Sequence, residues 1–262
     1  MTLEMVLLSD LIFKLDPKLE KYVKPTLKKP TSPYLTEDYK EINLFEKVDP
    51  SHLHNLFEGY PKKDVNFIMQ HLKQGSNQKN KFLSDLISQE VSKRLFNHYS
   101  VLPYDKFPSF EGSKVLFLSY IQIKELIDLL SVFDIKLTLK TSIDKQINQH
   151  ILHALSPLQL KFLKIVDKQQ EKVAFKKIPL ETWDKKKESL HAMLYLRGLN
   201  RLCKTFASSS FFVHEEIILR LPLKDKPLFF SLATQSEQTV KESLMGQFNS
   251  AIDFMNLPKL NS

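Results

Sequence analysis

Glycine is the residue whose distribution most limits the folds open to this chain. The 262 residues include 5 glycines, at positions 59, 75, 112, 198 and 246, and no two of them lie within one loop of each other. Tight turns and loops that approach a phosphate depend on glycine, because it adopts positive φ without strain. The spacing therefore excludes the P-loop, the dinucleotide-binding fingerprint and the serine nucleophile elbow, all of which need clustered glycines.

The rest of the composition favours helices, since leucine, lysine, glutamine and glutamate are plentiful. A hydrophobic fraction of 42% is enough for a core. We predict a mainly α fold: an irregular helical bundle with at most a few short extended segments. We expect an N-terminal helical region over residues 1–140, which includes a proline- and lysine-rich segment at 24–50, and a C-terminal helical region over 141–262. The two regions are also compatible with one continuous domain.

The sequence favours a reducing compartment. Cys203 is the single cysteine, so no intrachain disulfide can form. Glu4 stands where a signal peptide needs positive charge, so we expect no signal peptide. The most apolar run, residues 115–133, is interrupted by Lys124 and Asp128, among others. We interpret it as a buried core helix rather than a membrane span, because charges are costly at the bilayer centre.

Capping signals and periodicity place the expected helices. Asp49 before Pro50 and Ser156 before Pro157 each offer a side-chain oxygen at a helix start, and Gln159 completes a capping box with Ser156. The pattern predicts helices over residues 3–15, 50–99 with a break at Gly75, 115–133, 142–155, 157–172, 181–206 and 236–255. A loop over 101–113 and a short extended or turn-like stretch over 136–140 are also expected.

No constellation of residues indicates catalysis or metal binding. His150 and His153 would share a helix face, but no Glu-x-x-His pattern or cysteine cluster accompanies them, so polar surface or a satisfied core is the better interpretation. Cys203 falls on the inner stripe of a helix, where it acts as a small hydrophobe. Glu215 with Glu216, and Asp167 with Glu171, are better explained by a solvated face or by salt bridges than by acid–base chemistry. We therefore predict no catalytic, cofactor-binding or metal-binding residue, and no enzyme.

The net charge of +8 comes mostly from lysine. Four of the 38 basic residues are arginines: Arg94, Arg197, Arg201 and Arg220. Proteins that read phosphates usually employ arginine, whose planar fork binds them bidentately, so a nucleic-acid function is disfavoured, although attraction to an acidic partner stays open. Lysines concentrate at residues 14–29 and 161–188, most densely at 185–187. We prefer a solvated face to a docking patch for both.

Two short motifs suggest a family. The first consists of Ser156, Pro157, Leu158 and Gln159, and the second of Leu219, Arg220, Leu221 and Pro222. Together with the long helix between them and the closing helix, they resemble the SctK family (YscK, PscK) of bacterial type III secretion systems. The resemblance covers about residues 148–255 and leaves residues 1–140 unmatched.

The resemblance implies an α-helical adaptor without catalytic activity or cofactor, located in the bacterial cytoplasm at the inner membrane. Such a protein links the cytoplasmic domain of the ring protein SctD to the sorting-platform pods built from SctQ. No docking residue carries over from the family. For residues 219–222 we expect a structural role, with both leucines packed inward and Arg220 paired with a carboxylate or with carbonyls. A helical interaction protein of another bacterial assembly and a basic nucleic-acid-binding protein remain as alternatives.

Overall fold

The computed structural model describes residues 47–74, 109–166, 183–234 and 238–256, together with helical positions between 87 and 95. All regular secondary structure in these ranges is helical, which confirms the predicted mainly α fold. The predicted helix over residues 3–15, the lysines of residues 14–29, the pair Asp167 and Glu171 and most of segment 24–50 lie outside the described residues. The chain divides into two compact units, residues 1–108 and residues 109–262, and each is described by itself.

The first unit contains α4 (Pro50–Leu56) and α5 (Lys62–Gln74). α4 begins as the sequence predicted: the Asp49 carboxylate accepts the Ser51 N–H at 2.9 Å, and Pro50 occupies the first helical turn. Gly59 adopts a φ of 89° in the turn between the two helices, a conformation that favours glycine. Buried side chains from both helices and from positions 87–95 form the core of this unit: Leu53, Phe57, Ile68, Ile87 and Val91.

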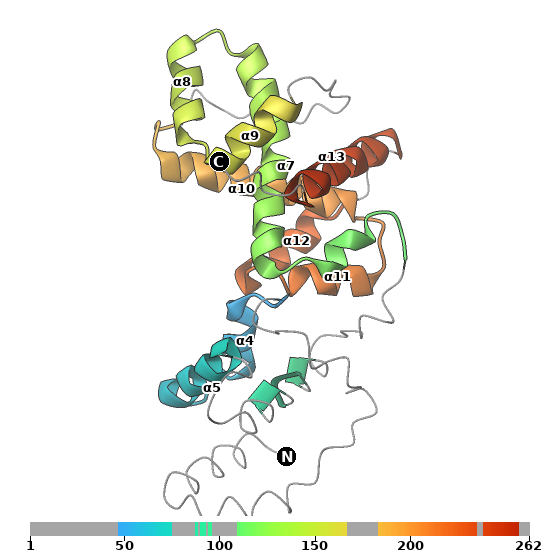
Figure 1. Ribbon diagram of the computed structural model, residues 1–262. Helices are drawn as coiled ribbons and strands as arrows, with labels where there is room; N and C mark the ends of the chain where they lie inside the picture. The colour runs from blue at the N-terminus through green and yellow to red at the C-terminus, as the bar shows by residue number, and fades with distance from the viewer. Residues whose placement is uncertain are drawn as a thin grey trace, which may run out of the picture. The chain divides into compact units, whose positions relative to one another are not determined.

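The second unit is built around α7 (Tyr120–Thr141). The 3-10 helix η5 (Ser113–Phe117) precedes it, and the later elements are α8 (Lys145–Ala154), α9 (Pro157–Val166), α10 (Lys187–Thr205), α11 (Phe211–Ile218), the 3-10 helix η7 (Leu223–Asp225), α12 (Lys226–Leu232) and α13 (Gln238–Asn256). α7 packs most extensively on α10, and also on α9 and α13. Figure 1 shows α8 and α9 toward one end of α7 and α11 and α12 toward the other.

The boundaries of α7 differ from those expected. Residues 115–133 do not form one helix, because η5 ends at Phe117 and Ser119 starts a new helix through a capping box. The Ser119 hydroxyl accepts the Gln122 N–H at 3.2 Å, and the Ser119 N–H donates to Gln122 Oε1 at 2.8 Å. The extended or turn-like stretch predicted over residues 136–140 is wrong, since these residues form the last turns of α7.

Buried polar contacts explain why α7 continues through a strand-like sequence. Residues 136–140 alternate polar and aliphatic side chains, the pattern of a strand. In the helix, however, the hydroxyl of buried Thr138 donates to the Asp134 carbonyl at 2.8 Å. Buried Lys136 extends its ammonium group to the carbonyl of Val166, the last residue of α9, at 2.6 Å. Tertiary contacts thus outweigh the local pattern.

The contact between α7 and α10 is made backbone to backbone. A Cβ atom added at Gly198 would lie 1.9 Å from the carbonyl oxygen of Ile127, far inside any permitted contact. Glycine is therefore required at this point by close approach rather than by its φ angle. Apolar side chains of α7, α8 and α10 fill the space at the α8 end of the unit: Ile135, Ile151, Leu155, Trp183, Leu190 and Leu194.

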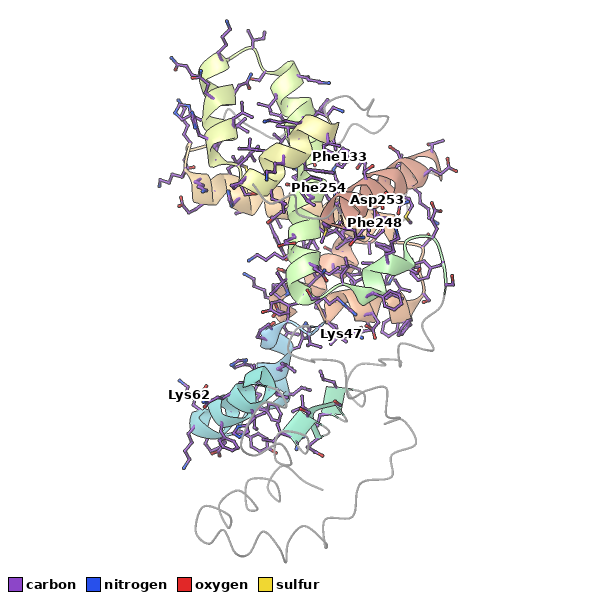
Figure 2. The ribbon with its side chains drawn as sticks, viewed as in Figure 1. Lys47, Lys62, Phe133, Phe248, Asp253 and Phe254 are labelled. Carbon is purple, nitrogen blue, oxygen red and sulfur yellow. The ribbon has the colours of Figure 1, made fainter. Side chains whose placement is uncertain are left out.

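Aromatic rings join α13 to the rest of the unit. The Phe162 ring lies 5.8 Å from that of Phe133 and 5.0 Å from that of Phe254, and the rings of Phe206 and Phe248 are 5.2 Å apart. Figure 2 labels Phe133, which lies on α7, and Phe248 and Phe254, which lie on α13. Offset and edge-on ring pairs of this kind add to the free energy of area burial.

The other helices of the second unit agree in part with those predicted from the sequence. α13 confirms the predicted closing helix, and Leu244, Phe248 and Ile252 are buried at steps of four. α8 begins after Asp144, whose carboxylate accepts the N–H groups of Gln146 and Ile147 at 2.8 and 3.2 Å. α10 begins at Lys187 rather than at residue 181.

A turn stabilised by side chains precedes α10. The Asp184 carboxylate accepts the Lys186 N–H and the Ser189 hydroxyl, and the Trp183 indole N–H donates to the Lys186 carbonyl at 3.0 Å. The Ser189 hydrogen bond, followed by that of Lys186, lowers the pKa of Asp184. This turn fixes the start of the helix six residues later than the periodicity indicated.

α7 belongs to the second unit, which begins at Ser109, whereas the sequence placed residues up to 140 with the N-terminal region. The reason is its packing against α9, α10 and α13, all of which follow it in the chain. Among the helices that the structure describes, none combines the length and apolarity needed to cross a bilayer.

Candidate interaction surfaces

Residues 219–222 follow α11 and turn the chain toward η7. Leu219 and Leu221 are each 1% exposed, and so is Arg220 between them. The Arg220 guanidinium donates to the carbonyls of Leu116 and Leu118, both at 2.6 Å, and to the Glu216 carboxylate at 2.9 Å. The inward leucines and the pairing of the arginine are those expected from the sequence, with a carboxylate and carbonyls serving together.

Arg220 fixes a stretch of backbone more than a hundred positions earlier in the chain. Its two carbonyl partners flank Phe117, while the side chains of Leu116 and Leu118 are buried. Phe117 itself is 57% exposed. A planar guanidinium can serve several acceptors in one plane, which a lysine cannot do. The arginine of the motif therefore acts as an internal clamp on the segment that leads into α7.

The other motif begins α9. The Ser156 N–H donates to Gln159 Oε1 at 3.0 Å, and the Gln159 N–H donates to the Ser156 hydroxyl at 3.2 Å, which confirms the predicted capping box. The amide nitrogen of Gln159 also approaches the Asp128 carbonyl of α7 at 3.4 Å. Pro157 is exposed and Leu158 is half-buried.

The two motifs contact different parts of α7 and do not form one site. Gln159 reaches Asp128, whereas Arg220 reaches Leu118, just before the helix. Asp128 lies eight residues into α7 from Tyr120, about 12 Å along the helix axis, whereas Leu118 precedes the helix. Each motif positions one element on the central helix, so both act in the architecture of the second unit.

A buried ion pair that the sequence analysis missed joins three helices. Arg201 of α10 donates to both carboxylate oxygens of Asp134 on α7, at 3.0 and 2.9 Å, and to the side-chain oxygen of Gln247 on α13. Arg201 is 1% exposed and Asp134 is 3% exposed. The signal in the sequence was Asp134 itself, a carboxylate directly after an apolar run, because a buried charge needs a partner.

The residues considered for chemistry are dispersed or occupied. His150 and His153 are exposed on α8, and His150 Nδ1 lies 2.7 Å from the Gln146 carbonyl oxygen. Cys203 is fully buried in α10, and burial raises the pKa of its thiol. A raised pKa keeps the thiol protonated and unreactive. Among the residues that the structure describes, no three ligand-type side chains gather around a possible metal position.

Glu215 and Glu216 are not a solvated face. Both are buried, Glu215 with Lys226 at 3.5 Å and Glu216 with Arg220 at 2.9 Å. The salt bridges expected from the sequence are present: Glu216 pairs with Arg220 inside the unit, and Glu215 pairs with the partly exposed Lys226 at the start of α12. Because both carboxylates are ion-paired, we assign them a structural role.

Asp128 is a half-buried carboxyl group on α7. Desolvation by burial raises its pKa, while nearby Lys124 and His191 act in the opposite direction and Glu125 adds to the rise. Because its pKa differs between the folded and unfolded chain, this group makes the stability of the second unit depend on pH.

Among the described residues of the second unit, the excess of positive over negative charge lies at one end, here named the basic end: residues 135–166 and 183–193. This end carries eight lysines against three acidic residues, whereas the other described residues of the unit carry nine basic and nine acidic side chains. Except for Lys136, all lysines of the basic end are exposed. The densest run, Lys185 to Lys187, precedes α10, and Lys185 adopts a positive φ of 60°.

Several large apolar side chains of the second unit are exposed. Those in the electrically balanced part are Phe117, Ile121, Leu196, Phe211 and Phe230. Those in the basic end are Ile143, Leu152 and Ile165. Single exposed apolar residues are ordinary on protein surfaces. Here one group lies in the part of the unit with balanced charge and the other lies in the basic end, so the two groups have different electrostatic surroundings.

Comparison with protein-family models, with curated proteins and with solved structures finds no match for this chain.

Proposed function

We propose that this chain is a non-catalytic adaptor of a bacterial type III secretion system. In this role it links the cytoplasmic domain of the inner-membrane ring protein SctD to the sorting-platform pods built from SctQ, and works in protein transport at the cytoplasmic face of the inner membrane. The proposal rests on the resemblance of residues 148–255 to the SctK family. The proposed mechanism consists of protein binding alone, so it requires no cofactor.

One observation carries the proposal beyond the short motifs themselves. Both motifs that resemble the family have architectural contacts: Gln159 positions α9 on α7, and Arg220 clamps the segment before α7. A motif retained for packing would keep its residues while the surface around it diverges. This supports a family relation in which Gln159 and residues 219–221 serve packing, while the docking residues lie elsewhere and vary.

The distribution of charge supports a binding function. The carboxylates of Asp134, Glu215 and Glu216 are all buried in ion pairs within the second unit. The balanced part of the unit, meaning its described residues outside the basic end, also exposes apolar side chains that suit protein contact. Phe211 is 61% exposed and Leu196 is 49% exposed. We assign the contacts with protein partners to this part of the unit.

Co-purification tests the proposal. The full chain should bind the SctD cytoplasmic domain and SctQ from the same bacterium, each measured separately by titration calorimetry. Phe211→Ser and Leu196→Ser should weaken at least one of these complexes with only a small loss of thermal stability, because about half or more of each side chain is exposed. Gln146→Ser, an exposed change outside the balanced part, serves as the control. Failure to bind either partner would remove the adaptor function and leave a helical interaction protein of another assembly.

A further inference from the structure

We infer that the second unit contacts an anionic lipid bilayer directly, through the connection between α7 and α8. The α7–α8 tip is defined as residues 140–145, and its central residue, Ile143, is 97% exposed. This proposal goes beyond the adaptor function and does not depend on it, since the ligand is the lipid surface itself.

The tip is an anchored turn with a protruding apolar side chain. The Ser142 N–H donates to the Thr138 carbonyl at 2.9 Å, which closes α7 on one side of Ile143. On the other side, Asp144 caps α8 through the N–H groups of Gln146 and Ile147. Both neighbours of Ile143 are thus fixed, so the isoleucine is held outward rather than left free to fold back.

Lysines lie on both sides of this apolar point in the chain, and the neighbouring helix α9 carries a further one. Lys140 and Lys145 flank it along the chain, and both are exposed. The hydrogen bond from Lys136 to the Val166 carbonyl brings the end of α9 beside the last turns of α7, and with it exposed Lys164 and half-exposed Ile165. Long lysine side chains can reach lipid headgroups while an apolar neighbour enters the acyl boundary.

The charges nearby favour an anionic surface. Asp144 is the acidic residue of the tip, and its carboxylate is occupied as a helix cap. The basic end has five more lysines than acidic residues, while the rest of the described unit is balanced. Figure 1 shows the α7–α8 connection at the end of the unit remote from α11 and α12. The electrostatic field of this uneven charge distribution orients the tip toward an anionic membrane.

Other polyanions fit less well. Nucleic-acid surfaces employ arginine forks and aromatic platforms, but the arginines of the second unit lie in its balanced part, and the large apolar side chains exposed at the basic end are aliphatic. An acidic protein surface would need a complementary concave partner for a convex turn with one projecting isoleucine. A fluid bilayer accommodates such a point without a preformed pocket.

Vesicle sedimentation tests the proposal with the full chain. The probe is vesicles of phosphatidylglycerol and phosphatidylethanolamine, compared with vesicles of phosphatidylcholine alone. Binding should require phosphatidylglycerol and fall with added salt. Ile143→Ser should weaken binding by about threefold to tenfold, from the lost apolar contact. Lys145→Glu should weaken it by roughly tenfold, from the reversed charge.

Matched controls make the same chemical changes in the balanced part. Phe211→Ser and Lys224→Glu alter exposed residues there and should leave vesicle binding within about twofold of the wild-type protein. Circular dichroism verifies that every variant is folded. Absence of binding to the phosphatidylglycerol vesicles at low salt overturns the proposal, as does an equal loss in tip and control variants. Binding to polyglutamate or duplex DNA that Ile143→Ser leaves unchanged, without binding to vesicles, would assign the basic end to a protein or a nucleic acid instead.

Discussion

Replacement of Gly198 by alanine is the sharpest test of how α7 and α10 meet. In an exposed helix interior this change stabilises a protein by about 1 kcal/mol, because alanine loses less backbone entropy on folding. At Gly198 the added methyl group would stand 1.9 Å from the Ile127 carbonyl oxygen and 2.8 Å from its carbonyl carbon. Both are backbone atoms, so no side-chain rotation can relieve the contact.

The expected magnitude follows from the distances. Ordinary contacts of a Cβ atom begin near 3.4 Å, so the two helices must separate locally by about 1.5 Å. Overpacking of this kind costs about 3 kcal/mol, at the upper end of its usual range, and the helix-propensity gain offsets about 1 kcal/mol. Gly198→Ala should therefore lower the free energy of unfolding of the second unit by about 2 kcal/mol or more.

Urea unfolding followed by tryptophan fluorescence measures this free energy. Trp183 is the single tryptophan of the chain, and it is buried in the second unit against the core of α7, α8 and α10. Its emission reports on that unit whatever the first unit does. With a slope of about 2 kcal/mol per molar urea, the midpoint should fall by about 1 M.

Gly246 supplies the matched control. It lies within α13, and a Cβ atom there would meet nothing within 4 Å. Gly246→Ala should raise the unfolding free energy by about 0.4–1 kcal/mol, so the two variants should differ in sign. If Gly198→Ala proves as stable as Gly246→Ala, the helices do not cross at Ile127, and the packing argued for α7 is refuted.

Arg220→Ala should destabilise the second unit by about 3–5 kcal/mol, because it leaves buried Glu216 without its cation, and Arg220→Lys should recover only part of this loss in the same urea titration. A fully stable Arg220→Ala variant would contradict the clamp. Asp128→Asn should raise stability at about pH 7 but not at about pH 3, below the unfolded pKa of about 3.9. A raised folded pKa gives stability that is present below the unfolded pKa and lost as pH rises through the folded one. Paired urea titrations at the two pH values check it, and a gain of equal size at both would refute it. Cys203 should react with a disulfide reagent only on unfolding, so its labelling rate should rise with urea along the Trp183 transition; rapid labelling in buffer would contradict its burial.

The parts of the fold that sequence could predict are those set by neighbouring residues. The capping box of Ser156 and Gln159 spans one helical turn, and the closing helix has apolar residues at steps of four, so both follow from local rules. The pairing of Arg220 with a carboxylate and carbonyls was also expected, although the sequence did not identify Glu216, Leu116 and Leu118 as its partners.

The parts that sequence could not predict depend on partners far along the chain. Asp134 is matched by Arg201 across 67 positions, and neither residue type indicates the other. The Lys136 ammonium group donates to the Val166 carbonyl of α9, 30 positions further along the chain, and residues 136–140 themselves give no sign of this contact. The basic end is likewise invisible as a surface until α8, α9 and the start of α10 come together, since its lysines are spread over three segments.

The clamp of Arg220 on the carbonyls of Leu116 and Leu118 has a consequence for synthesis of the chain. The contacts join positions 104 and 102 residues apart. A ribosome adding about 5–20 residues per second needs roughly 5–20 s to make that interval. During this time α7 has emerged without the arginine that fixes its approach or the Arg201 that neutralises Asp134. The apolar central helix therefore lacks these partners until residue 220 has been translated, and chaperones can bind it during this interval.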